Sequence, residues 1–231
     1  MAELSVIVPT YFEASGVEAF LAVTAQRLQG IPHEFIVVDA SDDATAELAS
    51  AFGARVIKSE AGRARQMNAG AAVARGEYLM FLHCDTYLPR YILSWWNHLK
   101  AEQAAWGFFY LRLSGTRRVF RVIERAICLR SKWTSVSTGD QVQFVRSDVW
   151  RALGGFNTVP IMEDVELSKR LRRIERPLIW KRPVITSSRR WQECGVARTV
   201  LLMWGLRLAY WLGVAPERLA SFYRARRNGF F

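Results

Sequence analysis

The sequence predicts an α/β fold with a mostly parallel sheet flanked by helices. Three observations predict it. Four short apolar runs occur within about the first 85 residues, and segments with helical spacing separate them. Two of those runs end in a carboxylate, at Asp39 and at Asp85. Strands buried on both faces of a parallel sheet are nearly continuous apolar runs, and helical crossovers connect them.

Each predicted strand is a short apolar run bounded by turn residues. The first run stops at Pro9, and the fourth leaves Gly76 and ends in His83, Cys84 and Asp85. Ligands of open α/β sheets bind at the carboxyl ends of such strands, so this edge is the expected site. The predicted strands cover residues 4–9, 34–39, 54–58, 78–83, 106–114 and 142–145.

Helical periodicity fills the intervals between these strands. Ser15 and Glu18 have capping-box spacing before the first helix, while Gly30, Gly53 and Gly154 mark helix ends. Residues 132–140 are rich in Ser and Thr and predict a loop. The predicted helices cover residues 17–30, 43–52, 63–74, 91–105, 117–130, 147–153 and 163–174.

Charge is distributed unevenly. Residues 1–85 hold 6 Lys and Arg against 11 Asp and Glu, whereas residues 86–231 hold 26 against 10 and contain all nine Trp. Such a basic half suits anionic lipid headgroups, nucleic acid or phosphorylated substrates. A basic surface over core aromatic residues is the alternative interpretation.

The cysteines and the N-terminus predict a location. Three widely spaced cysteines form neither a disulfide framework nor a zinc pattern, and they suit a reducing compartment. No basic segment precedes an apolar stretch at the N-terminus, so we expect no signal peptide. The longest apolar stretch, residues 199–214, is shorter than the roughly 20 residues of a bilayer span. We expect a cytoplasmic protein, either free or peripheral on the inner face of the membrane.

The C-terminal residues 199–227 are apolar and aromatic at first and basic afterwards, and Pro216 is expected to start a second helix. Three arrangements stay open for this extension. It lies in a membrane interface, it pairs with a second subunit in a homodimer, or it packs back on its own sheet.

The outline is Rossmann-like, but no Gly-x-Gly-x-x-Gly motif follows the first strand. The turn there runs from Pro9 to Glu13, which argues against a dinucleotide site of the usual kind.

Five motifs in order resemble the inverting nucleotide-sugar glycosyltransferases of family two, closest to their small, single-domain bacterial members. The resemblance covers about residues 4–191 and rests on their succession, since each motif alone is weak. The motifs are SVIVPT at 5–10, VVDASDDAT at 37–45, the stretch from Asn68 to Asp85, Gly154-Gly155-Phe156 with Glu163-Asp164, and SRRW at 188–191.

The resemblance implies a GT-A fold in one domain, residues 1–195, followed by an amphipathic helical extension, 196–231. Residues 1–90 would bind the nucleotide and residues 91–195 the acceptor. The implied reaction moves a sugar from a nucleoside-diphosphate sugar, with UDP as the predicted nucleotide, to a hydroxyl acceptor. The basic, Trp-rich half suggests that this acceptor is a lipid or a lipid-linked molecule. Donor contacts are expected from Pro9, Thr10, Tyr11, Glu13, Asp39, Arg63, Arg65 and Asn68.

Three of these donor contacts have structural alternatives. Tyr11 is expected to stack on the base and Asp39 to accept hydrogen bonds from the base or ribose, unless Asp39 only caps the next helix. Arg63 and Arg65 flank a helix start, where they either meet phosphate or line a solvated helix face.

A divalent cation, Mn²⁺ or Mg²⁺, would neutralise the leaving diphosphate, and Asp85 is the expected ligand. The family pattern has Asp-x-Asp where this chain has His83-Cys84-Asp85. His83 either ligates the metal, which would favour Mn²⁺, or only donates a hydrogen bond. A strand-end Asp that caps the following turn is the structural alternative for Asp85.

Asp164 is the expected general base, because the resemblance assigns that role to the second acid of the pair. At a helix start the helix dipole would hold its pKa down and keep it ionised. Gly155, Glu163, Arg190 and Trp191 would form the acceptor and diphosphate loop. The alternatives are that the acids only satisfy the helix dipole and that residues 189–191 are a plain basic loop.

Two rival functions remain. A nucleotidyltransferase acting on a sugar phosphate would release pyrophosphate instead of a nucleoside diphosphate. A non-catalytic basic module would bind membranes or polyanions in a salt-sensitive manner. It leaves the acidic strand ends unexplained, so no nucleic-acid partner is expected.

Overall fold

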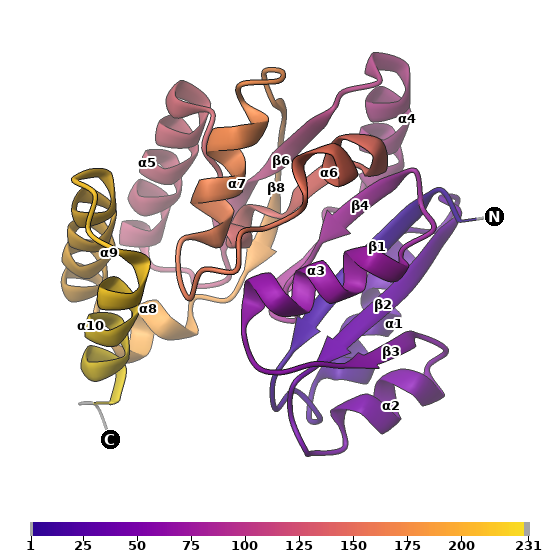
Figure 1. The fold of residues 1–231 in the computed structure, drawn as a ribbon, viewed down its shortest axis with the longest axis horizontal. Helices are drawn as coiled ribbons and strands as arrows, with labels where there is room; N and C mark the ends of the chain where they lie inside the picture. The colour runs from indigo at the N-terminus through magenta and orange to yellow at the C-terminus, as the bar shows by residue number, and fades with distance from the viewer. Residues whose placement is uncertain (1, 229–231) are drawn as a thin grey trace.

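The computed structural model describes residues 2–228, apart from the side chains of Arg190 and residues 224–228. Its centre is an eight-stranded sheet in the order β3-β2-β1-β4-β7-β6-β8-β5 (Figure 1). The first four strands are mutually parallel, β7 is antiparallel to both of its neighbours, and β6 and β8 are parallel again. The predicted α/β fold with a mostly parallel sheet is therefore confirmed.

The first half of the chain alternates strand and helix. The element bounds are β1 Leu4–Thr10, α1 Val17–Arg27, β2 His33–Asp39, α2 Thr45–Ala51, β3 Arg55–Lys58, α3 Arg63–Val73, β4 Tyr78–Phe81, β5 Thr86–Tyr87 and α4 Ile92–Glu102. Each predicted strand and helix of this half exists, because its apolar period is regular and glycines mark its ends. Ser15 makes no capping bond; Gly16 takes the N-cap position of α1.

The second half is less regular. Its bounds are β6 Trp106–Leu113, α5 Arg118–Thr134, the 3₁₀ turn η1 Gly139–Gln141, β7 Gln143–Arg146, α6 Ser147–Leu153, α7 Glu163–Leu171, β8 Leu178–Thr186, α8 Arg189–Glu193, α9 Val196–Trp211 and α10 Pro216–Asn228. The predicted loop at 132–140 is wrong at both ends, since α5 runs on to Thr134 and η1 begins at Gly139. The elements β5, β8 and α8 were not predicted from the sequence.

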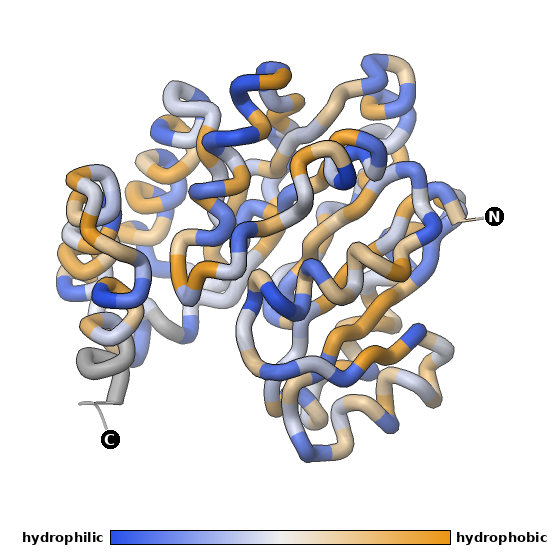
Figure 2. Tube along the Cα trace, viewed as in Figure 1, coloured by the Kyte–Doolittle hydropathy of each residue, from blue (hydrophilic) through white to orange (hydrophobic). Residues whose placement is uncertain are grey.

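Two apolar clusters cover the two faces of the sheet. Val6 and Val8 of β1 point into one cluster with Phe20 of α1 and Trp95 of α4. Ile7 points into the other with Met67 of α3 and Leu167 of α7. Figure 2 shows the hydrophobic residues concentrated along the central strands. This alternation is why the strands read as continuous apolar runs.

The C-terminal helices pack back on their own chain through one side. Leu206 of α9 and Leu219 of α10 are buried in a third cluster with Val136, Met162 and Val165. Of the three arrangements left open, packing back on the same chain therefore accounts for the buried side of these helices. The contacts are with the start of α7 more than with the sheet. Among residues 2–228, no helix has both the length and the apolarity that crossing a bilayer requires.

Candidate active site

The carboxyl edge of the sheet brings the predicted site residues together. β1, β2 and β4 all end there, at Thr10, Asp39 and Phe81. β7 runs the opposite way, and its first residue, Gln143, pairs with Phe81. The η1 turn that precedes β7 therefore lies beside the segment that follows β4, and the two halves of the chain meet at this edge.

Asp164 lies in the first turn of α7 and faces this edge. Its Oδ2 accepts a hydrogen bond from the Gly139 N–H at 2.7 Å, and its Oδ1 accepts one from the Val165 N–H at 2.7 Å. Gln143 holds the start of the helix by donating to the Asp164 carbonyl at 3.1 Å. Asp164 is thus fixed in position, with its carboxylate bound by one backbone N–H of η1 and one of α7.

The electrostatics of Asp164 differ from the expectation. Burial, followed by the neighbouring charge of Glu163, raises the pKa of Asp164 to about 6, although both N–H groups and Arg63 act to lower it. The predicted lowering by the helix dipole is wrong, because removal of the carboxylate from water outweighs it. A pKa near 6 still leaves the group largely ionised at neutral pH.

Two charged residues of this edge were missed from the sequence. Thr138 donates a hydrogen bond to Asp140, and burial raises the pKa of the Asp140 carboxyl, with Asp164 and Asp85 adding to the rise. Arg130 of α5 extends toward Gln141 at 3.4 Å, and burial lowers its pKa against the opposing charges of Asp140 and Asp164. The capping-box spacing of Thr138 and Gln141, which η1 does use, was the available signal.

Asp85 is exposed at the same edge, and its carboxylate accepts one hydrogen bond, from Thr86 Oγ1 at 3.2 Å. Glu13 lies near enough that Asp85 adds to the rise that burial causes in the pKa of Glu13. No group of three or more His, Cys, Asp and Glu side chains suited to a metal occurs in the described part of the chain. One or two carboxylates and substrate phosphates are a common environment for Mg²⁺, so Asp85 fits a cation shared with a diphosphate.

His83 packs against η1. A Cβ at Gly139 would lie 2.9 Å from His83 Nε2, so only glycine allows the turn this close. Burial, followed by the charge of Arg63, lowers the pKa of His83 to about 4. The imidazole is therefore neutral at pH 7, and it packs from the segment that bears Asp85 against the turn that binds Asp164. Whether it ligates a cation stays a prediction.

Asp39 is completely buried and has three partners. Its Oδ1 accepts hydrogen bonds from Thr10 Oγ1 at 2.9 Å and Ser41 Oγ at 2.7 Å, and its Oδ2 pairs with Lys58 Nζ at 2.8 Å. The carboxylate thereby ties together the ends of β1, β2 and β3. Its carboxylate is fully buried and has a scaffold role here, and the predicted contact with the donor base or ribose stays a prediction. Asp43, the better-placed cap, accepts the Thr45 N–H at 3.2 Å.

The two arginines of α3 have different surroundings. Arg63 Nη1 lies 3.9 Å from Glu163 Oε1, so it belongs to the edge and connects the starts of α3 and α7. Arg65 forms an exposed ion pair with Glu60, and no contact of Arg65 with a site residue is observed within the described residues. For Arg65 the alternative of a solvated helix face applies.

Asn68 does not point into the site. Its Nδ2 donates to the Phe156 carbonyl at 2.8 Å, and its Oδ1 accepts the Phe156 N–H at 2.9 Å. The predicted donor contact is corrected to a clamp on the Gly155-Phe156 loop, because both amide ends are already used. Gly155 has φ +77°, and a Cβ there would lie 2.7 Å from Asn68 Oδ1. Gly155 is thus required by backbone conformation and packing.

The loop after β1 presents aromatic rings. Pro9 is half-buried and Thr10 is buried against Asp39, whereas Tyr11 and Phe12 are 55% and 54% exposed and stack edge to face at 4.6 Å. Gln66, which the sequence analysis did not single out, joins the ends of β1 and β2 from α3 by donating to the carbonyls of Thr10 and Val38. Tyr11 is available for a stacking partner.

The late motif is positioned near the edge. Arg189 lies close enough to Glu13 to oppose the rise in its pKa. Trp191 packs partly buried against the first apolar cluster, so it supports the α8 turn from within. The side chain of Arg190 lies outside the described part of the structure.

The sequence profile of glycosyl transferase family 2 matches residues 5–157. The chain belongs to this family. The match includes the loop after β1, the ends of β2 and β4, the η1 turn and the Gly154-Gly155 loop, and it ends before Asp164. A search of curated proteins gave no match.

Solved structures confirm the GT-A fold. Residues 1–349 of TarS from S. aureus align with a TM-score of 0.63 at 19% identity, over 81% of this chain and 61% of that chain. A mannosyltransferase from Pyrobaculum calidifontis, solved with GDP-Man and Mn²⁺, aligns with a TM-score of 0.58 at 22% identity, over 80% and 56%. Glucosyl-3-phosphoglycerate synthase from Mycobacterium tuberculosis gives 0.56 at 21%, over 80% and 70%. At these identities the likeness concerns the fold, and this chain spans about three fifths of the TarS fragment.

Proposed function

We propose that this family 2 member transfers a sugar from a nucleoside-diphosphate sugar, with UDP as the predicted nucleotide, to an acceptor hydroxyl by single displacement with inversion. The observation that carries the proposal is Asp164. It is a carboxylate fixed by two N–H groups at the carboxyl edge of the sheet, with a pKa raised to about 6. A base is most effective when its pKa lies near the working pH.

The residues of the edge divide the work. The Asp164 carboxylate accepts the proton of the acceptor hydroxyl as that oxygen attacks the anomeric carbon. Tyr11 offers an exposed ring for the nucleobase, and Arg63 with the N-terminus of α3 offers positive charge to the diphosphate. A divalent cation bound at Asp85 would supply further neutralisation of the leaving group. The neighbour solved with GDP-Man and Mn²⁺ supports a nucleotide-sugar donor and a cation of this kind.

The acceptor proposed is a lipid or lipid-linked hydroxyl, reached from the cytoplasmic side of a membrane. Its support is the basic, Trp-rich second half of the chain. A homodimer remains a prediction from the sequence.

The test compares Asp164→Asn with Asp148→Asn, a matched first-turn acid on α6 that pairs with Arg146 at the surface. Transfer is followed as release of nucleoside diphosphate over a panel of UDP- and GDP-sugars and hydroxyl acceptors. Donor binding is followed separately, by thermal shift with and without Mn²⁺. Asp164→Asn should lower turnover at least about 10³-fold while the donor-induced shift persists. Asp148→Asn should leave both unchanged.

Full turnover in Asp164→Asn would remove the base assignment. Release of pyrophosphate in place of a nucleoside diphosphate would establish nucleotidyl transfer. Absence of a thermal shift with any donor, together with salt-sensitive binding to polyanions, would favour the non-catalytic module.

A further inference from the structure

The outer face of α5 carries an apolar stripe. Its exposed residues recur three or four positions apart, which places them on one side of the helix. Val122 is 64% exposed and Trp133 76% exposed, whereas the inner residues Phe120 and Ile123 are buried in the core. The stripe consists of Val119, Val122, Ala126, Leu129 and Trp133.

Helix α9 carries a second stripe. Its inner side is buried through Leu206, but its outer residues remain exposed, including Trp204 at 72% and Trp211 at 75%. The stripe consists of Leu201, Trp204, Leu208, Trp211 and Leu212. A helix that is apolar on all sides is normally covered on all sides, so this outer face lacks the partner that its composition requires. Both helices lie on the side of the molecule away from β1 to β3 (Figure 1).

Cations border the α5 stripe. Arg118, Arg125 and Lys132 are seven residues apart, so they form a row along the same helix, and all three are exposed. Within the described residues, none of them forms an ion pair. An apolar stripe flanked by uncompensated cations is the arrangement of helices that bind anionic membrane surfaces.

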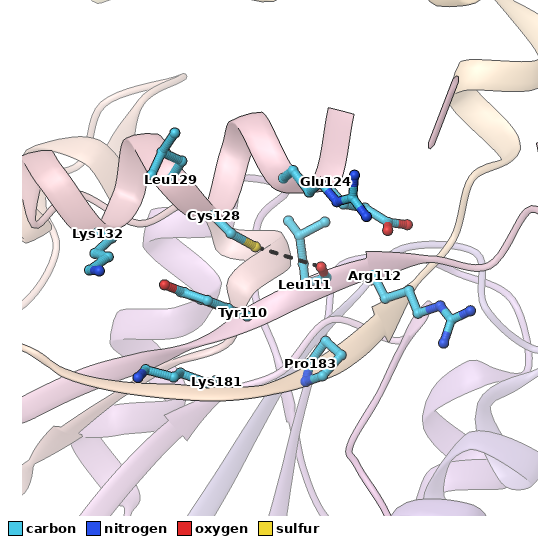
Figure 3. A pocket seen from close by; sticks show the side chains of 10 residues that line it. Tyr110, Leu111, Arg112, Glu124, Cys128, Leu129, Lys132, Lys181 and Pro183 are labelled. Atoms are coloured by element: carbon cyan, nitrogen blue, oxygen red, sulfur yellow. Dashed lines mark hydrogen bonds between the residues drawn. The ribbon is translucent and has the colours of Figure 1, made fainter. Parts of the chain in front are cut away.

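A cavity of about 450 Å³ opens between α5 and the strands β6 and β8 (Figure 3). Leu111, Leu129 and Pro183 contribute apolar lining. The cations are Arg112, Arg125, Lys132 and Lys181, with Lys132 and Lys181 at one end and Arg112 at the other. The acid in the lining, Glu124, is already engaged by the Leu113 N–H at 2.6 Å and by Arg121 at 2.8 Å. The cavity therefore offers unpaired positive charge above an apolar floor.

We propose that the stripes of α5 and α9 dock on an anionic lipid bilayer and that the cavity receives the acidic headgroup of one lipid. The charge of the surface favours a bilayer over a second copy of the chain, because two copies would bring like charges together. Tryptophans suit the headgroup level, where a ring is apolar on one side and its N–H meets water. The proposal gives the membrane contact of the proposed function its residues, and vesicle binding tests it without any nucleotide sugar.

Hydrogen bonds link the docking helix α5 to the reacting edge. The same helix that carries Arg125 and Lys132 outward holds Ser131 inward, and Ser131 donates to Gln141 Oε1 in η1 at 2.8 Å. Asp164 binds the first residue of that turn. The docking face and the proposed base are therefore connected through one helix and one turn.

The test is flotation with vesicles of phosphatidylcholine alone or mixed with phosphatidylglycerol. The unaltered protein should bind the mixed vesicles and lose them at high salt, and inorganic phosphate at matched ionic strength should not replace the lipid. Arg125→Gln with Lys132→Gln should weaken binding about 30-fold, at about fivefold per cation. The matched control is Arg75→Gln with Arg151→Gln, two exposed cations elsewhere, which should have no effect.

A second variant tests the apolar stripe. Trp204→Ser with Trp211→Ser should also reduce binding to mixed vesicles, whereas Leu93→Ser on α4 should not. Melting temperature is measured for each variant to establish folding. Binding equal to that of the unaltered protein in both double variants would overturn the proposal. A dimer in solution that Trp204→Ser with Trp211→Ser dissociates, without vesicle binding by the unaltered protein, would assign the face to a second copy.

Discussion

Two carboxylates of the same edge, one from each half of the chain, are treated in opposite ways. Asp39 is buried among Lys58, Thr10 and Ser41, so its charge is compensated by a cation and two hydroxyls. Asp164 receives hydrogen bonds only from backbone N–H groups, has no ion pair of its own in the described structure, and its pKa is raised to about 6. The compensated carboxylate builds the fold, and the uncompensated one is free to exchange a proton.

The contrast extends to the neighbouring residues. In the first half, the side-chain amides of Gln66 and Asn68 form hydrogen bonds with backbone atoms of adjoining segments. In the second half, burial raises the pKa of Asp140 and lowers the pKa of Arg130, in each case against the charged form. The first half thus supplies the hydrogen-bonded edge, and the second half brings ionisable groups to it.

Replacement of Asp39 is expected to have the largest effect on stability, and it tests whether this carboxylate builds the fold. Asp39→Asn should lower the free energy of unfolding by about 3 kcal/mol, since it removes the anion from a buried network and leaves Lys58 with only the Ser41 carbonyl as a partner. Denaturant unfolding measures the change. The control is Asp85→Asn, an exposed strand-end carboxylate of the same half, which should change stability by less than about 0.5 kcal/mol. A small loss of unfolding free energy in Asp39→Asn would contradict the scaffold role.

The parallel half of the fold could be predicted because its signals are local. Residues 4–85 repeat strand and helix with glycines or turn residues between them, and every predicted element there exists. β8 was missed because Lys181, Arg182 and Pro183 interrupt its apolar pattern; the strand is held by pairing with β6 across a bulge. That pairing joins residues about 70 positions apart, which no local window contains.

The sequence predicted that Asp85 follows a buried strand, and the structure places it in the turn between β4, which ends at Phe81, and β5, whereas its role as a metal ligand stays a prediction. The site was not predictable where burial decided the role. Asp39 and Asp85 look alike in sequence, yet Lys58 reaches only the first. Asp140 was placed in a loop, because its relation to Asp164 depends on the pairing of Gln143 with Phe81.

The clamp at Asn68 offers the next effect in size. Asn68→Ala should cost about 2 kcal/mol of unfolding free energy, because the N–H and carbonyl of Phe156 both lose a partner in a partly buried place. Donor-induced thermal shifts should stay the same, since the side chain does not face the donor. Asn97→Ala, an exposed asparagine on α4, is the control without effect. Loss of donor binding with unchanged stability would restore the contact predicted from the sequence.

The smallest effect concerns the pKa of Asp164. Turnover should rise with pH through a midpoint of about 6 and then level, because the base acts only when ionised. The charge of Glu163 raises this pKa and that of Arg63 lowers it. Turnover at saturating donor should therefore shift to lower pH in Glu163→Gln and to higher pH in Arg63→Gln, each by less than about one pH unit.

These two variants separate the causes of the shifted pKa. If the helix dipole governed Asp164, both profiles would stay together at a midpoint below the ordinary aspartate value of about 4. Opposite displacements around a midpoint near 6 require a carboxylate that burial has raised and that its neighbours adjust. Measuring turnover at saturating donor keeps any weaker diphosphate binding in Arg63→Gln out of the comparison. Displacement of both profiles in the same direction would show that the rise of turnover with pH does not report the ionisation of Asp164.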